Sequence, residues 1–389
     1  MKLITKLCIF FFCFCSFAQQ NWLKGNLHTH SLWSDGDDFP EMIIKWYKDN
    51  GYQFVAISDH NTIADEIRWI KMKDREVKNK TLLKYKTTFG DWVEAKDSLN
   101  ETYVRLKTYK EYKNKMETVG KFTIIKSEEV TSSFQKKPIH INVSNLQEYI
   151  PPFTGNSVVE VMQKTLDHVH EQREKTNTPM IAHINHPNFG YGITAEDMKK
   201  LTGEQFFEVY NGHPAVHNEG DHEHMSIEEM WDIINVSYYK QGKPLLYGIG
   251  TDDSHHYHKF APELSNTGRG WIMVNTIDNE PNAIITAMEK GLFYASSGVT
   301  LSTVSVSKSE YSIAIEKVPG NNYEIIFYGL KKGTDKVIEL SKTNGTNARY
   351  SFQNNDVFVR AKINSTYKIK NPYKEGETAQ AWTQPVLVK

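Results

Sequence analysis

The sequence predicts an α/β protein whose strands form a parallel sheet, open or closed into a barrel, followed by a smaller β region. Three observations lead to this prediction. Short apolar runs alternate with helix-like patterns between Leu23 and about Ser297, as expected of repeated strand–helix units. Histidines or carboxylates stand at the end of nearly every one of these apolar runs. After Gly298 the pattern changes to alternating strand-like segments separated by glycine and asparagine turns.

The composition is that of a folded soluble chain. It has 389 residues, of which 39% are hydrophobic and 24% charged, and a formal net charge of −1. A charge this close to zero gives no overall attraction to nucleic acid or to an anionic membrane. We therefore expect a small-molecule substrate and no nucleic-acid partner.

The first residues have the pattern of a secretory signal peptide over residues 1–18. Lys2 and Lys6 form a basic start, residues 7–14 are apolar, and Ser16-Phe17-Ala18 places small residues where a signal peptidase cleaves. We predict cleavage after Ala18, no stable membrane anchor afterwards, and a secreted or periplasmic protein. The alternatives are an uncleaved anchor, for which the apolar run is too short to span ~30 Å of hydrocarbon, and a lipoprotein.

All three cysteines, Cys8, Cys13 and Cys15, lie inside this segment. The mature chain therefore has no thiol for a disulfide, for nucleophilic catalysis or for zinc ligation. Any metal site must be built from histidine, aspartate, glutamate and water.

The barrel-like region is predicted to cover residues 19–298. Its first helix is expected over 39–50, where apolar residues have helical spacing and Gly51 ends the pattern. Buried strands and two further helices follow in alternation. The strands are expected at 24–27, 52–58, 122–125, 139–143, 180–182, 206–210 and 245–249, and the helices at 157–174 and 226–234.

Two segments stand apart from this alternation. Residues 65–120 are rich in lysine, glutamate and tyrosine, and we interpret them as a helical insertion that serves either as a solvated decoration or as a lid. Residues 299–389 predict a small β domain, resembling a sandwich, in which we find no catalytic cluster.

Polar residues at the strand ends predict a metal site. His28 and His30 directly follow the first strand, and residues two apart on an extended segment point to the same side. The carboxyl ends of strands in a parallel barrel meet on one face, where active sites lie. The other candidates on that face are Asp35, Asp59, His60, Glu128, Glu129, His140, His183, His186, Asp252, Asp253, His255 and His256.

The order of these motifs resembles the polymerase and histidinol phosphatase (PHP) superfamily over about residues 23–297. The order in question is His28-x-His30, Asp35, Asp59-His60, Glu129, His140, His186-Pro187 and Asp253-x-His255. This resemblance implies a distorted (β/α)7 barrel and two or three divalent ions, commonly Zn, Mn or Fe. The long insertion, Gly270-Trp271, Val359-Arg360-Ala361 and the run from Ala381 to Pro385 look like a secreted carbaryl-hydrolase-like branch.

The resemblance also implies which residues hold each ion. One ion would be bound by His28, His30, Glu129 and Asp253. A second would be bound by Asp35, His60 and His255, with Asp35 standing where many relatives have histidine. The third would be bound by Glu129, His140 and His186, so that Glu129 bridges.

Two of these placements have a neighbouring rival. Glu129 is preferred to Glu128 because it directly precedes Val130-Thr131, as in the motif of the family. His186 is preferred to His183 because the family has histidine before proline, although His183 also lies at a strand end. Asp59 is expected to orient His60 from behind.

Other residues carry weaker hypotheses. Arg269 lies between two glycines and is either an anion contact of the active site or an ordinary surface arginine. His168 and His170 fall on a helix, where residues two apart do not share a face, so we expect them outside the site. The loop 211–224 contains four histidines and is either a substrate-contact loop or a plain solvated loop.

The sequence therefore predicts a hydrolase that uses a metal-activated water. The leading hypothesis is a phosphoesterase for a small phosphate ester, with Asp35, His60, His255 and Arg269 as the catalytic candidates. The second hypothesis is hydrolysis of a carboxylic ester, amide or carbamate by the same centre, because both reactions need an activated water and a stabilised oxyanion. A third, of another class, is a non-catalytic metal-dependent binding protein.

Overall fold

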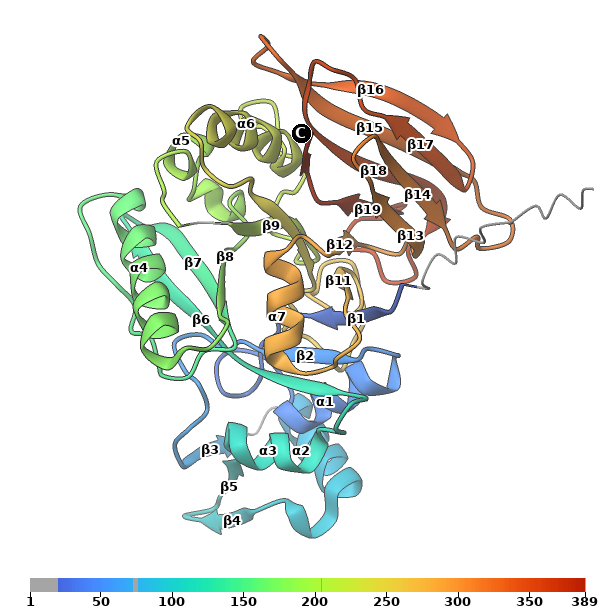
Figure 1. The fold of residues 1–389 in the computed structure, drawn as a ribbon. Helices are drawn as coiled ribbons and strands as arrows, with labels where there is room; N and C mark the ends of the chain where they lie inside the picture. Colours follow the sequence, from blue (N-terminus) through green and yellow to red (C-terminus); the bar gives the residue numbers. More distant parts are fainter. Residues whose placement is uncertain (1–19, 73–75, 204, 389) are drawn as a thin grey trace, which may run out of the picture.

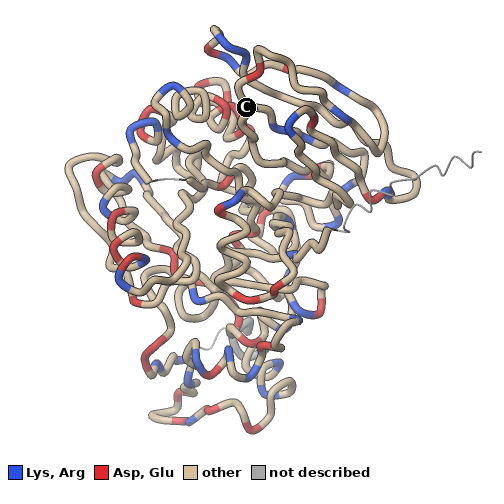
Figure 2. Tube along the Cα trace, in the orientation of Figure 1, with Lys and Arg blue, Asp and Glu red and all other residues tan. Residues whose placement is uncertain are grey.

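The computed structural model describes residues 20–72, 76–203 and 205–388. The predicted signal peptide, with its three cysteines, lies outside these ranges. Among the described helices, none is long and apolar enough to cross a membrane. Acidic and basic residues are interspersed along the chain (Figure 2), in keeping with the net charge of −1.

A mixed sheet of 14 strands forms the centre of the molecule (Figure 1). Seven of its strands lie side by side in the sheet in the same order as along the chain. They correspond to the seven strands predicted for the barrel. They are β1 (Trp22–Asn26), β2 (Phe54–Ile57), β6 (Thr123–Phe134), β7 (Lys137–Ser144), β8 (Ile181–Ile184), β9 (Phe206–Asn211) and β10 (Tyr247–Thr251).

The alternation of strand and helix is broken once, between β6 and β7. These strands form an antiparallel hairpin, and β7 is also antiparallel to β8. The turn consists of Gln135 and Lys136, both with positive φ (49° and 68°), a geometry that joins antiparallel strands in two residues. A turn this short leaves no room for the crossover helix that a parallel pair needs, so the expected all-parallel sheet is corrected here.

In the part of the chain that the structure describes, the sheet does not close by pairing β1 with β10. It continues beyond β1 with further strands. β1 pairs with β11 (Trp271–Asn275), and β11 pairs with β12 (Phe293–Ser296), both antiparallel. Within the described residues no hydrogen-bonded ladder joins β10 to β1 or β11. The architecture is thus a mixed α/β fold around a large sheet, and the closed (β/α)7 barrel stays a prediction.

Helices cover this sheet because their apolar faces match its buried side chains. Pro40 begins α1, and serine caps begin α4 and α6. Ile284, Ile285 and Met288 of α7 pack against the apolar core that β1, β2 and β9 also share. The helices are α1 (Pro40–Asp49), α4 (Val158–Thr176), α5 (Ala195–Met198), α6 (Ile227–Lys240) and α7 (Pro281–Glu289).

The insertion at 65–120 contains both strands and helices, whereas the sequence predicted a helical insertion. Its strands form a separate three-stranded sheet in the order β3-β5-β4, and its helices pack with α1 around Tyr85, Val104 and Tyr112. Alternating residues in the 101–106 strand give it a buried face, which is a strand signal and not a helix signal. Its elements are β3 (Arg68–Met72), α2 (Glu76–Phe89), η1 (Gly90–Trp92), β4 (Ala95–Ser98), β5 (Glu101–Leu106) and α3 (Tyr109–Met116).

The C-terminal region consists of strands in two sheets that share one apolar core. One is a small sheet with the order β13-β14-β17. The other strands extend the central sheet, because β19 pairs with β12. The strands of the C-terminal region, in both sheets, are β13 (Leu301–Val306), β14 (Glu310–Ile315), β15 (Tyr323–Lys331), β16 (Val337–Asn344), β17 (Asn347–Ser351), β18 (Asp356–Lys368), β19 (Thr378–Thr383) and β20 (Val386–Leu387).

Candidate metal centre

The segment after β1 places two buried histidines on the same side. Asn26 ends the strand, and its side-chain oxygen accepts a hydrogen bond from the backbone N–H of His28 at 2.8 Å. His28 and His30 are both fully buried, with ring centroids 5.1 Å apart. The extended backbone expected from the sequence therefore brings both rings to one point.

Four ligand atoms meet at this point. Nε2 of His28 lies 3.4 Å from Glu129 Oε2 and 3.2 Å from Asp253 Oδ1, and Nε2 of His30 lies 3.1 and 3.3 Å from the same two oxygens. Ligands bonded at ~2.0–2.1 Å to a tetrahedral zinc ion would be roughly 3.3 Å apart. The spacing of these atoms fits one such cation.

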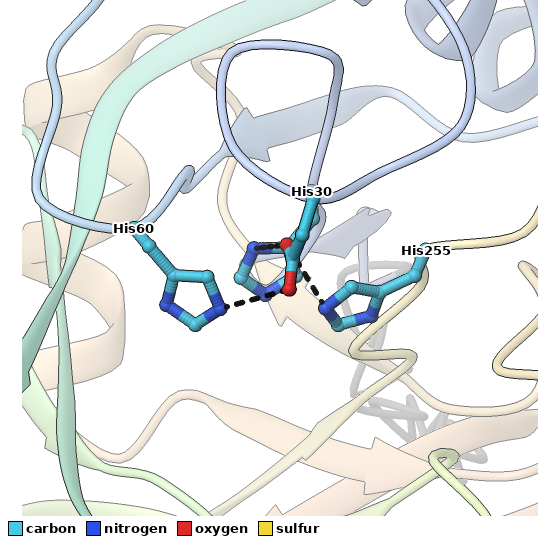
Figure 3. A group of neighbouring side chains, drawn as sticks. His30, His60 and His255 are labelled. Carbon is cyan, nitrogen blue, oxygen red and sulfur yellow. Dashed lines mark ion pairs between the residues drawn. The ribbon is translucent and has the colours of Figure 1, made fainter.

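A second group lies beside the first. Asp35 Oδ1 is 3.3 Å from His255 Nε2 and 3.7 Å from His30 Nδ1, and its Oδ2 is 3.5 Å from His60 Nε2. Figure 3 shows the rings of His30, His60 and His255 converging, with dashed lines marking these ion pairs. Asp35 is half exposed, so this group opens toward solvent.

The other oxygen of Glu129 belongs to a third group. Glu129 Oε1 lies 3.0 Å from His140 Nδ1 and 3.7 Å from His186 Nε2, which is itself 3.8 Å from Asp253 Oδ2. Glu129 therefore stands between two sets of histidines, as a bridging carboxylate would. The structure brings all nine sequence-predicted ligands together: His28, His30, Asp35, His60, Glu129, His140, His186, Asp253 and His255.

The β6–β7 hairpin explains how Glu129 and His140 reach the same place. Glu129 lies in the middle of β6, and His140 follows the turn on the antiparallel β7, paired with Thr131. Glu128 points to the opposite face, where its Oε1 accepts a hydrogen bond from the backbone N–H of Ile150 at 2.7 Å. Strand alternation thus separates the two neighbouring glutamates.

Hydrogen bonds behind the rings turn Nε2 of several histidines toward the centre. Nδ1 of His28 lies 2.6 Å from Glu208 Oε1, Nδ1 of His60 lies 2.5 Å from Thr131 Oγ1, and Nδ1 of His255 lies 3.0 Å from the carbonyl oxygen of Asp253. With Nδ1 occupied, Nε2 is the nitrogen left to bind a cation.

Burial and charge indicate that the cluster is built for cations. Every ion pair of Glu129 and Asp253 among the described residues is made with a histidine. Burial would raise the pKa of Glu129, but the neighbouring histidines, led by His60, hold it well below its usual value. Both ring nitrogens of His30 are buried without a hydrogen bond of good geometry. A cation would supply the missing partner and offset the buried carboxylates.

Two of the candidate ligands are held in an unusual backbone conformation. His186 has φ of +22° and Asp253 has φ of +49°, a region that non-glycine residues rarely adopt. Each such residue costs on the order of 1–3 kcal/mol, which the surrounding structure must offset. Next to Asp253, the Asp252 carboxylate stabilises this backbone segment, because it accepts hydrogen bonds from the N–H groups of Arg269 and Gly270 at 2.7 and 2.8 Å.

Glu208 is a central residue that the sequence analysis missed. It is fully buried on β9, and besides His28 it contacts the N–H of His186 at 2.8 Å and the hydroxyl of Thr251 at 2.7 Å. His183, the rival of His186, lies on this side of His28, with Nε2 3.6 Å from Glu208 Oε1. The available signal was a single carboxylate inside the apolar run 206–210.

Two hypotheses on individual residues are corrected. Arg269 is fully buried, and its guanidinium donates to backbone oxygens of Gly212 and Leu264 at 2.9 and 2.6 Å and of Ala261 at 2.9 Å. It ties loops together and is not free to contact a substrate anion. Asp59 accepts from the N–H and hydroxyl of Ser31 at 2.7 and 2.6 Å, so it anchors the loop that carries Asp35 and does not orient His60.

One histidine of the loop 211–224 lies at the edge of the cluster. The ring of His213 is 5.6 Å from that of His255 and 6.2 Å from that of Phe189, which in turn contacts the ring of His186 at 5.1 Å. Nδ1 of His213 accepts a hydrogen bond from the backbone N–H of Ala215 at 3.1 Å. The proton of the neutral ring therefore sits on Nε2, and burial lowers the pKa of His213 to about 4.

The helical histidines lie elsewhere. His168 and His170 are on α4, and His168 packs against Phe153 with ring centroids 5.6 Å apart. Neither belongs to a ligand group among the described residues.

Comparison with known proteins gives structural matches alone. No family model and no curated protein sequence matches the chain. A two-domain protein from Bacteroides vulgatus, described as containing a predicted PHP-like metal-dependent phosphoesterase, is 13% identical, with 94% of this chain and 95% of that chain covered and a TM-score of 0.42. A Bifidobacterium adolescentis protein with a proposed metal-dependent phosphoesterase activity is 11% identical, with coverage of 62% and 91% and a TM-score of 0.29. An amidohydrolase from Chromobacterium violaceum, with bound sulfate and no metal, is 14% identical, with coverage of 60% and 88% and a TM-score of 0.30.

Proposed function

We propose that this chain is a metal-dependent hydrolase of the PHP type that acts on a small phosphate ester. The observation that carries the proposal is the arrangement around Glu129 and Asp253, where several overlapping groups of ligand atoms lie side by side. Up to three adjacent cations fit the three non-bridging oxygens of a phosphate, whereas the carbonyl of a carboxylic ester offers one oxygen. Bound cations would also supply the positive charge that Arg269, whose guanidinium is held by backbone oxygens, does not supply to the substrate.

The candidate ligands form three sets, one for each ion. His28, His30, Glu129 and Asp253 would hold one ion, Asp35, His60 and His255 a second, and Glu129, His140 and His186 a third. When bound, such ions activate a water molecule and stabilise the leaving oxyanion. We propose Zn, Mn or Fe, as the resemblance to the PHP superfamily implies, and a ligand set of imidazole and carboxylate without thiolate is compatible with these metals.

The surrounding side chains would hold the substrate. Because Nδ1 of His213 is occupied by Ala215 N–H, its Nε2–H is a fixed donor at the edge of the cluster, and it is suited to a substrate oxygen. Glu208 fixes the ring of His28 and the backbone of His186 at once. These groups position charge before the substrate arrives, so little reorganisation is needed during the reaction.

A second candidate function is hydrolysis of an ester, amide or carbamate with an apolar group. The ring of Phe189 favours it, because this ring packs against His186 and His140 beside the third group of ligands. An apolar acyl or alkyl group would find a matching surface there, and the same activated water would serve.

The test is a substrate panel on purified protein loaded separately with Zn, Mn or Fe. We expect release of inorganic phosphate from p-nitrophenyl phosphate or a related small phosphate ester. His28→Ala should lose both bound metal and turnover, while His168→Ala, on α4, should keep both. Hydrolysis of p-nitrophenyl acetate or a carbamate alone would favour the second candidate. Stoichiometric metal without any turnover would favour a binding protein.

A further inference from the structure

A cavity lies away from the candidate metal centre, between β1, β11, α1 and the segment 367–371. Its volume is about 300 Å³, at the small end of the range that holds a small organic molecule. None of the nine candidate metal ligands lines it. The side chains that matter here are Lys24, Trp46, Tyr52, Phe260, Trp271 and Lys370.

Aromatic rings form the walls of this cavity. Trp46 and Phe260 are nearly parallel, at 26° with centroids 6.4 Å apart, and Tyr52 meets Trp271 edge-on at 6.3 Å. Phe260 is 46% exposed. Flat apolar walls of this kind favour a planar apolar ligand.

Lys24 is mostly buried at this site and has no anionic partner. Its ammonium nitrogen lies 4.0 Å from the ring centroid of Tyr52 and 3.8 Å from that of Trp271. Among the described residues, the ammonium makes no ion pair and no hydrogen bond, so these π faces are its only close partners. Burial lowers the pKa of Lys24 to about 8, despite the opposing influence of Asp252.

The charge of the lining has one sign. Among the described residues that line the cavity, Lys24 and Lys370 are the only lysines or arginines, and none is an aspartate or glutamate. The hydroxyls of Tyr52 and Thr267, both residues of the lining, are also buried without a hydrogen-bond partner. The cavity thus combines aromatic walls with two lysines and two hydroxyls that have no hydrogen-bond partner.

We propose that this cavity binds an organic anion consisting of a carboxylate on a planar aromatic body about the size of benzoate. The carboxylate would meet the Lys24 ammonium, and the ring would lie against Trp46, Phe260 and Trp271. The site is independent of the proposed hydrolase activity, since none of its residues belongs to the metal centre.

The test is titration of the metal-loaded full-length mature protein with benzoate, followed by tryptophan fluorescence and calorimetry. Benzoate should bind at one site, and its uncharged counterpart benzamide should bind roughly 10-fold more weakly or worse, because its neutral carbonyl can accept a hydrogen bond from the Lys24 ammonium but cannot form an ion pair with it. Lys24→Met should reduce the affinity for benzoate by a similar factor. Lys45→Met, on the same helix as Trp46 but outside the lining, is the matched control and should bind as the unmodified protein does.

A second variant and a metal-centre variant make the outcome decisive. Phe260→Ser changes an exposed ring and should weaken benzoate while leaving acetate unaffected. Equal affinity for benzoate and benzamide, or unchanged affinity in Lys24→Met, would overturn the proposal. If His28→Ala lost benzoate binding while Lys24→Met retained it, the anion would lie at the metal centre. That result would also overturn the proposal. Benzoate binding at Lys24 without any hydrolase activity would leave this inference standing and remove the proposed function alone.

Discussion

At the scale of single residues, two adjacent glutamates on β6 have opposite environments. Glu129 faces five candidate ligands, while Glu128 faces the apolar packing on the other side of the strand, near Ile150. Neighbours on a strand have this relation by geometry alone. The consequence is that the same substitution should have different effects at the two positions.

We predict that Glu129→Gln removes at least one metal ion and lowers kcat by a factor on the order of 100 or more. The amide keeps the shape of the side chain but loses the negative charge that two cations would share. Glu128→Gln is the control and should keep its metal and most of its rate. The measurement is kcat together with metal content by elemental analysis. An active Glu129→Gln beside an inactive Glu128→Gln would show that the ligand assignment is off by one residue.

The environment of Glu128 also predicts a pH dependence of stability. Burial raises the pKa of this carboxyl to about 8, above the value of about 4.5 expected in the unfolded chain. The protonated form is therefore favoured in the folded state, and stability is lost as the pH rises from about 4.5 through 8. The loss is on the order of 5 kcal/mol above pH 8.

Glu128→Gln should remove most of this loss, since the amide does not ionise. The measurement is the difference in unfolding free energy between the variant and the unmodified protein at pH 5, 7 and 9. Taking the difference cancels the pH dependence of the metal centre that both proteins share. A difference that stays constant from pH 5 to pH 9 would contradict the prediction.

At the scale of elements, the β6–β7 hairpin and the segment 187–192 hold one side of the centre together. A Cβ on Gly192 would lie 2.3 Å from the carbonyl oxygen of Pro138 on β7. This close approach keeps η2 (Phe189–Tyr191), with the ring of Phe189, against the hairpin that carries His140. Backbone atoms cannot move aside as a flexible side chain can.

We expect Gly192→Ala to push this segment off the hairpin. Its effect should be a loss of roughly 1–3 kcal/mol in unfolding free energy, with weaker binding at the third group of ligands. Gly51→Ala is the control, because Gly51 has open space around its Cα and only the cost of its positive φ. The measurements are urea unfolding and metal stoichiometry. Full metal content and unchanged stability in Gly192→Ala would show that the contact is not needed.

At the scale of the whole molecule, the C-terminal half, with strands β13 to β20, is joined to the N-terminal half, residues 20–298, by more than chain connectivity. The sheet is continuous through β12 and β19. The side-chain amide of Gln384 pairs with both backbone groups of Gly248 on β10, at 2.8 and 2.9 Å. Arg360 of β18 is buried and binds both carboxylate oxygens of Asp232 on α6 at 2.7 Å. The two halves should therefore unfold together.

We predict that Arg360→Met lowers the unfolding free energy by roughly 3 kcal/mol or more, because it leaves Asp232 without its partner in a mostly buried place. Lys240→Met breaks an exposed pair with Asp335 between the same two halves and should cost less than about 1 kcal/mol. Urea unfolding followed by fluorescence and by activity should give one transition in each protein. Two separate transitions, with activity retained after the first, would show that the halves are independent.

The sequence by itself determined the local features of this protein. The spacing of His28 and His30 on an extended segment predicted that both rings face one side. Strand alternation predicted that Glu128 and Glu129 point to opposite faces, whereas the preference for Glu129 as the ligand came from the resemblance to the PHP motif. The apolar runs predicted most of the strands around the centre. These features depend on neighbours in the chain, which the sequence contains directly.

Only the tertiary structure decided the features that depend on distant contacts. The sequence did not show whether Arg269 contacts a substrate anion. In the structure its guanidinium donates hydrogen bonds to the backbone oxygens of Gly212, Ala261 and Leu264. Glu208 stood inside an apolar run, and its role appeared only when β9 placed it 2.6 Å behind His28. The direction of β7 and the continuity of the sheet through β19 likewise depend on which strands pair. Pairing is a choice among segments far apart in sequence, and local patterns do not specify it.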